Sequence, residues 1–223
     1  LDFMDSKEST SNIYKETATT YTVGTSFYIN QKHKEASSYL EKSLKLAESL
    51  SVNVKSKYQK RIIWKLGMAY SKSGRKQEAI LLIKELINMV EQEYKRDYQK
   101  QRPFYNIDSY RIQYYSFMIS NLDLLTPKEE NDYWKRILLI GKKLTNDFDK
   151  YNYYLCANNY YTNSRTQKDL SKAIAANDTL IKIAKILAPQ NLPGLLNTVS
   201  LLYEKQKDYP NALKYYKNSH YIQ

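Results

Sequence analysis

Cysteine, histidine, glycine and proline are all scarce in this chain of 223 residues. The single cysteine, Cys156, excludes an intramolecular disulfide and cannot build a zinc site, so we expect a small buried residue on a helix. The two histidines, His33 and His220, lie far apart in the sequence, and we expect no metal site between them. Five glycines and five prolines leave few turns, which favours long helices over many short strands.

Long apolar runs are also absent. No unbroken run exceeds five residues, as in AILLI at 79–83, whereas a membrane helix needs about 20. We therefore expect no membrane contact within this chain. No signal peptide is visible, and a chain that begins at Leu1 is expected to be processed or to be part of a longer one.

Catalytic motifs are missing as well. The sequence has no P-loop, G-x-G-x-x-G or G-x-S-x-G pattern. The acidic run KEEND at 128–132 is what a helix N-terminus favours, and DFDK at 147–150 lacks the glycine and glutamate of a calcium loop. The sequence therefore predicts no enzyme, no cofactor and no metal.

Positive charge and tyrosine are what the chain has in excess. Its net charge is +12, but the lysines are spread along the chain, which favours a solvated basic surface, and we expect no nucleic-acid partner. Tyrosine occurs 23 times, against five phenylalanines and two tryptophans. Tyrosine has an apolar ring and a polar tip, so it suits half-buried positions and binding surfaces.

One spacing of small and large residues occurs three times. Counted from Ile63, the recurring positions are +3, +4 and +7, then +16, +20 and +23, which describes two antiparallel helices joined by a turn at Gly74. The first set is Ile63, Leu66, Gly67, Tyr70, Ala79, Ile83 and Leu86. The second is Thr20, Val23, Gly24, Phe27, Ala36, Leu40 and Ser43. The third is Leu196, Val199, Ser200, Tyr203, Ala212, Tyr216 and Ser219.

The residue types at these positions have a physical reason. Gly, Ala or Ser at +4 and +16 lets the two helix backbones approach closely, and large residues at +7 and +20 fill the space around that contact. One such hairpin cannot bury its outer apolar face alone, whereas a stack of hairpins buries a continuous core.

This pattern resembles the tetratricopeptide repeat, in which W-x2-L-G-x2-Y is followed by A-x3-F. The chain departs from that pattern, because the first large position is Ile63, Leu196 or Thr20 rather than Trp. The starts at Thr20 and Ile63 are 43 residues apart rather than the usual 34 or so. The resemblance implies an all-α, tetratricopeptide-like superhelical array.

We expect about five antiparallel helix pairs, near 17–50, 60–93, 103–146, 150–188 and 193–223, which together form a single array over 17–223. Residues 1–16 are expected to be a leading segment or a short helix. Within the middle pairs, helices are predicted at 103–122, 126–144, 151–163 and 169–187. Thr126 is the predicted N-cap of one of them, with Pro127 at the first position and Glu129 at the third, and Asp169 is the predicted cap of another.

The resemblance also implies a concave groove, lined by the first helix of each pair, that holds a protein or peptide. A suitable ligand is an extended peptide that places an apolar side chain on Trp64 and Met68. Acidic residues on either side of that side chain would contact the neighbouring cations. Alternatively, Trp64 packs against the neighbouring repeat. Some of the groove residues expected in the third and fourth helix pairs are also expected to lie in the core. The expected groove residues are Tyr21, Thr25, Tyr28, Arg61, Trp64, Lys65, Met68, Lys72, Arg111, Tyr115, Asn158, Asn197, Leu201 and Lys205.

The tail LYEKQKDYPNALKYYK at 202–217 resembles the helical-repeat sensor regions of bacterial two-component histidine kinases. That resemblance implies an extracytoplasmic (periplasmic) sensor or interaction region without catalysis of its own. The alternative is a cytoplasmic peptide-binding regulator or adaptor that controls a DNA-binding domain. Apolar residues persist to the end of the chain, at Tyr215, Tyr216, Tyr221 and Ile222, so we expect either that further chain of a longer parent protein packs there or that this end self-associates.

Overall fold

The computed structural model describes residues 2–99 and 107–221, and all regular structure within these ranges is helical. The predicted all-α class is therefore confirmed. The chain divides into two compact units, residues 1–103 and 104–223. A single array over 17–223 stays a prediction. Residues 103–106 of the predicted helix at 103–122 lie outside the described residues, as does Ile222.

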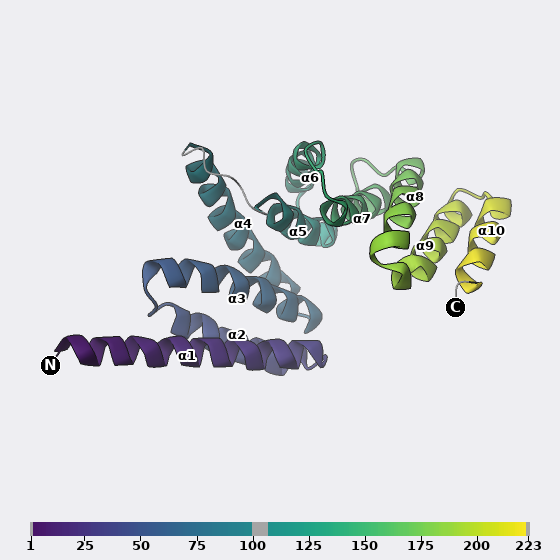
Figure 1. Ribbon diagram of the computed structural model, residues 1–223. Coiled ribbons are helices and arrows are strands. Elements are labelled where there is room, and N and C mark those ends of the chain that lie inside the picture. Colours follow the sequence, from purple (N-terminus) through teal and green to yellow (C-terminus); the bar gives the residue numbers. More distant parts are fainter. Residues whose placement is uncertain (1, 100–106, 222–223) are drawn as a thin grey trace. The chain divides into compact units, whose positions relative to one another are not determined.

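The first unit consists of two helical hairpins, α1 with α2 and α3 with α4 (Figure 1). Residues 2–16, the expected leading segment, form the N-terminal part of the long helix α1. Helix α3 packs against α2 and thereby joins the second hairpin to the first. The bounds are α1 Asp2–Ile29, α2 His33–Ala47, α3 Val52–Lys72 and α4 Lys76–Gln99.

The second unit has six helices and two short 3-10 turns among its described residues. Helix α7 contacts α5, α6 and α8, while α9 packs against both α8 and α10. The bounds are α5 Ile107–Ile119, η1 Leu122–Leu124, α6 Pro127–Gly141, α7 Asp147–Asn163, α8 Leu170–Leu187, η2 Pro189–Asn191, α9 Leu192–Lys205 and α10 Tyr209–His220.

Small residues mark the closest approach of paired helices, as the repeated spacing predicted. A Cβ atom added to Gly67 of α3 would lie 2.8 Å from Cδ1 of Ile83 in α4. After Ile83, the residue nearest to that atom is Ala79, through its carbonyl oxygen. In the last pair a serine takes the place of glycine, and Ser200 Oγ donates to the carbonyl of Ala212 at 2.8 Å. That bond satisfies the hydroxyl at a buried contact where an unpaired polar group would be costly.

The first helices of α1/α2, α3/α4 and α9/α10 all end in the same way. The residue at offset +11 has a left-handed conformation, with φ of 60° at Gln31, 90° at Gly74 and 63° at Lys207. The next N–H donates to the carbonyl at +7, which is the main bond of a Schellman end. These bonds are Lys32 to Phe27 at 2.9 Å, Arg75 to Tyr70 at 2.8 Å and Asp208 to Tyr203 at 2.9 Å. Gly74 is thus confirmed as a turn residue.

The predicted start of α6 is confirmed in detail. Thr126 and Glu129 form a reciprocal capping box, and Pro127 occupies the first turn. The predicted cap of α8 is also present, because the Asp169 side chain accepts from the N–H of Lys172 at 3.0 Å.

A buried carboxylate in α6 holds the loop between α7 and α8. Glu130 is fully buried, and it accepts hydrogen bonds from Ser164 Oγ and, at 3.1 Å, from Thr166 Oγ1. Arg165 Nε lies 3.5 Å from the other carboxylate oxygen. These contacts tie a loop to a helix more than thirty residues away and compensate the burial of the charge.

Candidate binding surface on the first unit

Three tyrosines lie along one face of α1. Tyr14, Tyr21 and Tyr28 are spaced seven residues apart, and this spacing returns each to nearly the same side of a helix. Tyr21 and Tyr28 are half-buried, and Tyr14 is exposed. The face therefore presents phenol rings in a row rather than a purely apolar stripe.

This tyrosine face meets α3 at two points. The Tyr14 and Tyr58 rings contact edge to face with centroids 5.5 Å apart, and the Tyr58 hydroxyl donates to the Tyr14 hydroxyl at 3.2 Å. Further along, Lys65 Nζ lies 5.3 Å from the centroid of the Tyr28 ring, within reach of a cation–π interaction. On α3 the residues that share the face of Lys65 follow at helical spacing. We call the combined set the α1/α3 surface: Tyr14, Tyr21, Thr25, Tyr28, Tyr58, Arg61, Lys65, Met68 and Lys72.

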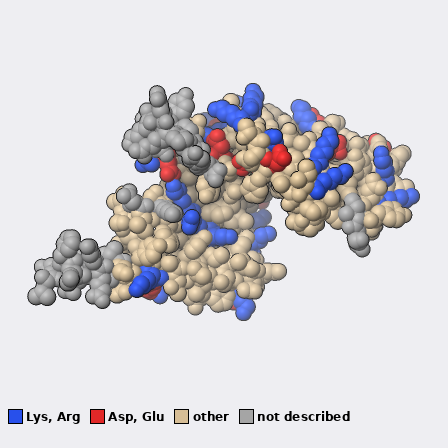
Figure 2. All heavy atoms as spheres, in the orientation of Figure 1, with Lys and Arg blue, Asp and Glu red and all other residues tan. Residues whose placement is uncertain are grey.

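The α1/α3 surface is basic. Helix α3 contains no Asp or Glu, and the cations among its described side chains are Lys55, Lys60, Arg61, Lys65 and Lys72. Within the described part of the chain, Arg61, Lys65 and Lys72 form no ion pair. Among the charged side chains visible on the first unit in Figure 2, Lys and Arg are more evident than Asp and Glu.

Neighbouring carboxylates and the tyrosines do not offset this charge. Among residues 11–29 of α1 the one carboxylate is Glu16, and it pairs with Lys42 of α2 at 2.9 Å. Burial raises the pKa of Tyr28, and the hydrogen bond with Tyr14, followed by burial, raises the pKa of Tyr58. Both phenols are therefore neutral near pH 7, and the surface has a net positive charge.

The structure brings together four of the eight groove residues predicted in the first unit, namely Tyr21, Tyr28, Arg61 and Lys65. Tyr28 and Lys65 are in contact, and Arg61 and Tyr21 both act electrostatically on Tyr58. Trp64 is half-buried beside this face and makes further contacts of its own. Thr25, Met68 and Lys72 share the faces of these residues by helical spacing, and their part in a groove stays a prediction.

The residues predicted in the second unit do not form a comparable cluster. Arg111 pairs with Asp108 of its own helix at 2.7 Å, and Asn158 accepts from Asn177 of α8 at 2.6 Å. Both side chains are engaged in contacts within the unit. The remaining predicted residues of α9 are exposed, namely Asn197, Leu201 and Lys205.

Tyr115 is a correction to the prediction. Its side chain is fully buried, with its ring 5.7 Å from that of Tyr133, so it belongs to the core of the second unit and offers no free surface. A tyrosine at helical spacing does not reveal which side of the helix the rest of the fold will cover.

Two residues of the α1/α3 surface escaped the sequence analysis. Tyr14 lies in the segment expected to precede the array, and Tyr58 lies before the repeat frame that starts at Ile63. The seven-residue spacing from Tyr14 to Tyr28 was the available signal, because it continues the helix backwards past residue 17.

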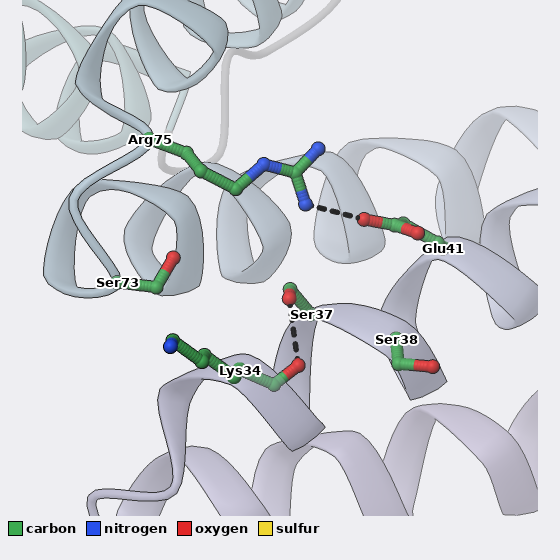
Figure 3. Close-up of a pocket in the computed structure, with 6 residues that line it drawn as sticks. All are labelled: Lys34, Ser37, Ser38, Glu41, Ser73 and Arg75. Carbon is green, nitrogen blue, oxygen red and sulfur yellow. Dashed lines mark hydrogen bonds and ion pairs between the residues drawn. The ribbon is translucent and has the colours of Figure 1, made fainter.

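A polar pocket of about 370 Å³ lies between α2 and the turn that joins α3 to α4 (Figure 3). Arg75 dominates it, and this residue pairs with Glu41 of α2 at 2.8 Å and with Glu78 through Nε at 2.7 Å. The guanidinium carbon also lies 3.7 Å from the centroid of the Tyr70 ring, and the Tyr70 hydroxyl donates to Glu41 at 2.7 Å. The pocket therefore fixes one hairpin to the next, with its principal cation already neutralised.

Other candidate chemistry is limited. Burial raises the pKa of the Cys156 thiol to about 12, so this residue is a buried structural thiol, as predicted. In the described part of the chain, no three His, Cys, Asp or Glu side chains come together to hold a metal ion. No described helix combines the length and the apolar character needed to cross a membrane.

Comparison with known proteins agrees with this architecture. A tetratricopeptide repeat family model matches residues 61–89, which cover the second half of α3 and the first half of α4. The crystal structure of BtubC (BKLC) from P. vanneervenii has a similar fold, with a TM-score of 0.62 at 11% sequence identity, over 97% of this chain and 90% of that one. At that identity the likeness shows the fold alone. No curated protein matches the chain.

Proposed function

Because this chain carries a tetratricopeptide repeat within an all-α, tetratricopeptide-like fold, we propose that it is a non-catalytic module that binds an acidic protein or peptide segment on the α1/α3 surface. The repeat itself supports a role in protein interaction. The single observation behind the choice of ligand is that Arg61, Lys65 and Lys72 line this surface without a carboxylate partner among the described residues.

The chemistry of the surface fits a mixed ligand. Arg and Lys supply charge-assisted hydrogen bonds to carboxylates. The rings of Tyr21 and Tyr28 and the thioether of Met68 supply half-buried apolar area, which suits a large side chain between the acidic residues. Tyrosine and arginine are also the residue types that contribute most at protein interfaces.

The biological context that we propose is the sensor or interaction region of a bacterial signalling protein of the histidine kinase type, on the extracytoplasmic side. The tail at 202–217 supports this through its resemblance to such regions. Sequencing of the parent reading frame tests it. An apolar stretch of about 20 residues followed by a heptad-patterned helix is the expected result. A DNA-binding helix pair encoded upstream would instead favour a cytoplasmic regulator.

Binding itself can be tested with a labelled peptide in which glutamates flank a short apolar segment. We expect Lys65→Glu to weaken binding by about tenfold or more, since it replaces an attraction by a repulsion at the centre of the surface. The matched control is Lys182→Glu on α8, which makes the same charge change at an exposed position of the second unit. Equal loss in both variants would show that net charge, rather than this surface, governs binding.

A nucleic acid is the competing class of ligand, because a basic surface with tyrosines can also stack bases. An unstructured single-stranded oligonucleotide serves as the second probe in the same assay. If it binds the wild-type chain more tightly than the acidic peptide does, and Lys65→Glu removes that binding, the proposed peptide function is wrong.

A further inference from the structure

Helix α10 presents an exposed apolar stripe. Tyr209, Leu213 and Tyr216 are 63%, 53% and 49% exposed, and their spacing of four and then three residues places them on one face of the helix. The buried residues Ala212 and Ser219 lie on the adjoining side of the helix, next to Tyr216, and this side packs on α9. The α10 stripe, defined as Tyr209, Leu213 and Tyr216, therefore borders the contact that holds the hairpin together but is itself left exposed.

The equivalent face of α8 is covered. Asp169 and Asp208 are both N-caps whose side chains accept from a backbone N–H three residues on, and aligning them pairs Ala173 with Ala212 and Ile174 with Leu213. Ile174 is only 7% exposed, because α9 covers it. The covering residues of α9 are Val199 and Leu202.

The same arrangement occurs in the first unit. Aligning Ala36 of α2 with Ala212 pairs Ser37 with Leu213 and Leu40 with Tyr216. Ser37 is buried, and α3 is the helix that packs against α2. Leu40 is buried within its own hairpin, where it packs against Gly24 of α1. In both units, the residue equivalent to Leu213 is thus buried on a second helix against which the next first helix packs.

The charges around the α10 stripe indicate what kind of helix would dock. Helix α10 contains no Asp or Glu, and Lys214 and Lys217 make no ion pair within the described residues. A second copy of α10 would bring the same lysines opposite these, which is unfavourable. A partner helix with acidic residues beside its apolar positions would be attracted instead.

We propose that the α10 stripe binds an amphipathic helix of a partner protein, with large apolar residues at the spacing of Leu195, Val199 and Leu202 in α9 and with acidic flanks. The α8–α9 interface supplies the geometry, and the lysines of α10 supply the selectivity. This surface lies in the second unit, and the inference does not depend on ligand binding at the α1/α3 surface.

The test uses the whole chain and a capped synthetic peptide of residues 191–206 in which Asn197 and Lys205 are replaced by glutamate. The control peptide has lysine at both positions. We expect the acidic peptide to bind more tightly than the basic one, and Leu213→Ser to weaken it by about tenfold. Leu81→Ser, the same change at an exposed leucine of α4, should leave the affinity unchanged.

A second variant separates this site from the first. Lys65→Glu should leave binding of the acidic peptide of residues 191–206 unchanged, because that residue belongs to the α1/α3 surface. If Lys65→Glu rather than Leu213→Ser removes the binding, the peptide occupies the other surface and the proposal is wrong. It is equally wrong if the chain dimerises in sedimentation experiments and Leu213→Ser abolishes the dimer, since a second copy then covers the stripe.

Discussion

A Cβ atom on Gly24 would lie 2.8 Å from Cγ of Leu40, so helices α1 and α2 approach as closely as they do only because residue 24 has no side chain. The second hairpin repeats this relationship, with Gly67 and Ile83 in the same roles. Leu40 and Ile83 are both fully buried and have little room to move away. The offsets +4 and +20 of the repeat thus mark the point at which each hairpin closes.

Gly24→Ala should destabilise the first unit. Overpacking at a tight contact costs about 1–3 kcal/mol, which exceeds the gain of at most about 1 kcal/mol from better helix propensity. Urea unfolding followed by circular dichroism measures the difference. Gly194→Ala on α9 is the control, because nothing lies within 4 Å of its added Cβ atom, and it should be neutral or stabilising. Similar effects of the two variants would contradict the close-packing argument.

The left-handed turn residues give a second prediction. Gln31 and Lys207 adopt the conformation that Gly74 adopts without strain. A non-glycine residue in this conformation destabilises the folded state by about 1–2 kcal/mol. Glycine, in turn, makes the unfolded chain more flexible, and this offsets up to about 1 kcal/mol of the gain from a change to glycine. Lys207→Gly should therefore stabilise the chain by about 0.5–1 kcal/mol, and Gly74→Ala should destabilise it. A loss of stability in Lys207→Gly would mean that the lysine side chain contributes a contact of its own.

Much of the fold could be predicted because its signals are local. The small residues Gly67 and Ala79, the cap at Thr126 and the turn at Gly74 each depend on a few neighbouring positions, and all appear where the sequence placed them. Helix propensity and capping act within one or two turns, so a single sequence contains the relevant information. The all-α class follows from these elements.

The remainder depends on contacts between distant residues. The burial of Tyr115 and the contact of Tyr14 with Tyr58 are set by which helices pack together, and helical periodicity does not specify that. Glu130 also appeared to be one more acidic residue at a helix start, although its partners lie in the loop after α7. The candidate surface was therefore predicted without Tyr14 of α1 and Tyr58 of α3.

Glu130→Ala should destabilise the second unit by about 2–4 kcal/mol. The variant leaves the Ser164 and Thr166 hydroxyls without their acceptor at a buried site, and it removes the partner of Arg165. The neighbouring exposed residue provides the control, and Asp132→Ala should change the free energy of unfolding by less than about 0.5 kcal/mol. Denaturant unfolding of both variants measures this. Equal stability of the two would show that the loop does not need the carboxylate.

Because of Tyr70, the free energy of unfolding should decrease as the pH rises in the alkaline range. Burial, and then the hydrogen bond to Glu41, raise the pKa of its phenol to about 12, above the ordinary value near 10. The neutral phenol is favoured in the folded state, so this contribution is complete below pH 10 and is lost as the pH rises through 12. The urea midpoint should fall over that range, and the fall should be smaller in Tyr70→Phe. The same change at the exposed Tyr209 should leave the slope unaltered.

Salt should weaken ligand binding at the α1/α3 surface. Between 0.1 M and 1 M ionic strength the screening length falls from about 10 Å to about 3 Å, which largely removes attraction between exposed charges. We expect the affinity for the glutamate-flanked peptide to fall by about tenfold over this range. Fluorescence anisotropy at several salt concentrations measures it. In Lys65→Glu the affinity should be low throughout and should vary less with salt.

A peptide with the same apolar segment and glutamines in place of the glutamates is the matched control. It keeps the contacts with the rings of Tyr21 and Tyr28 but loses the charge attraction, so salt should leave its weaker binding nearly unchanged. If both peptides bind equally tightly at low salt, the cations of α3 do not select the ligand. The apolar and tyrosine contacts would then determine binding, and Met68→Ala should reduce it more than Lys65→Glu does.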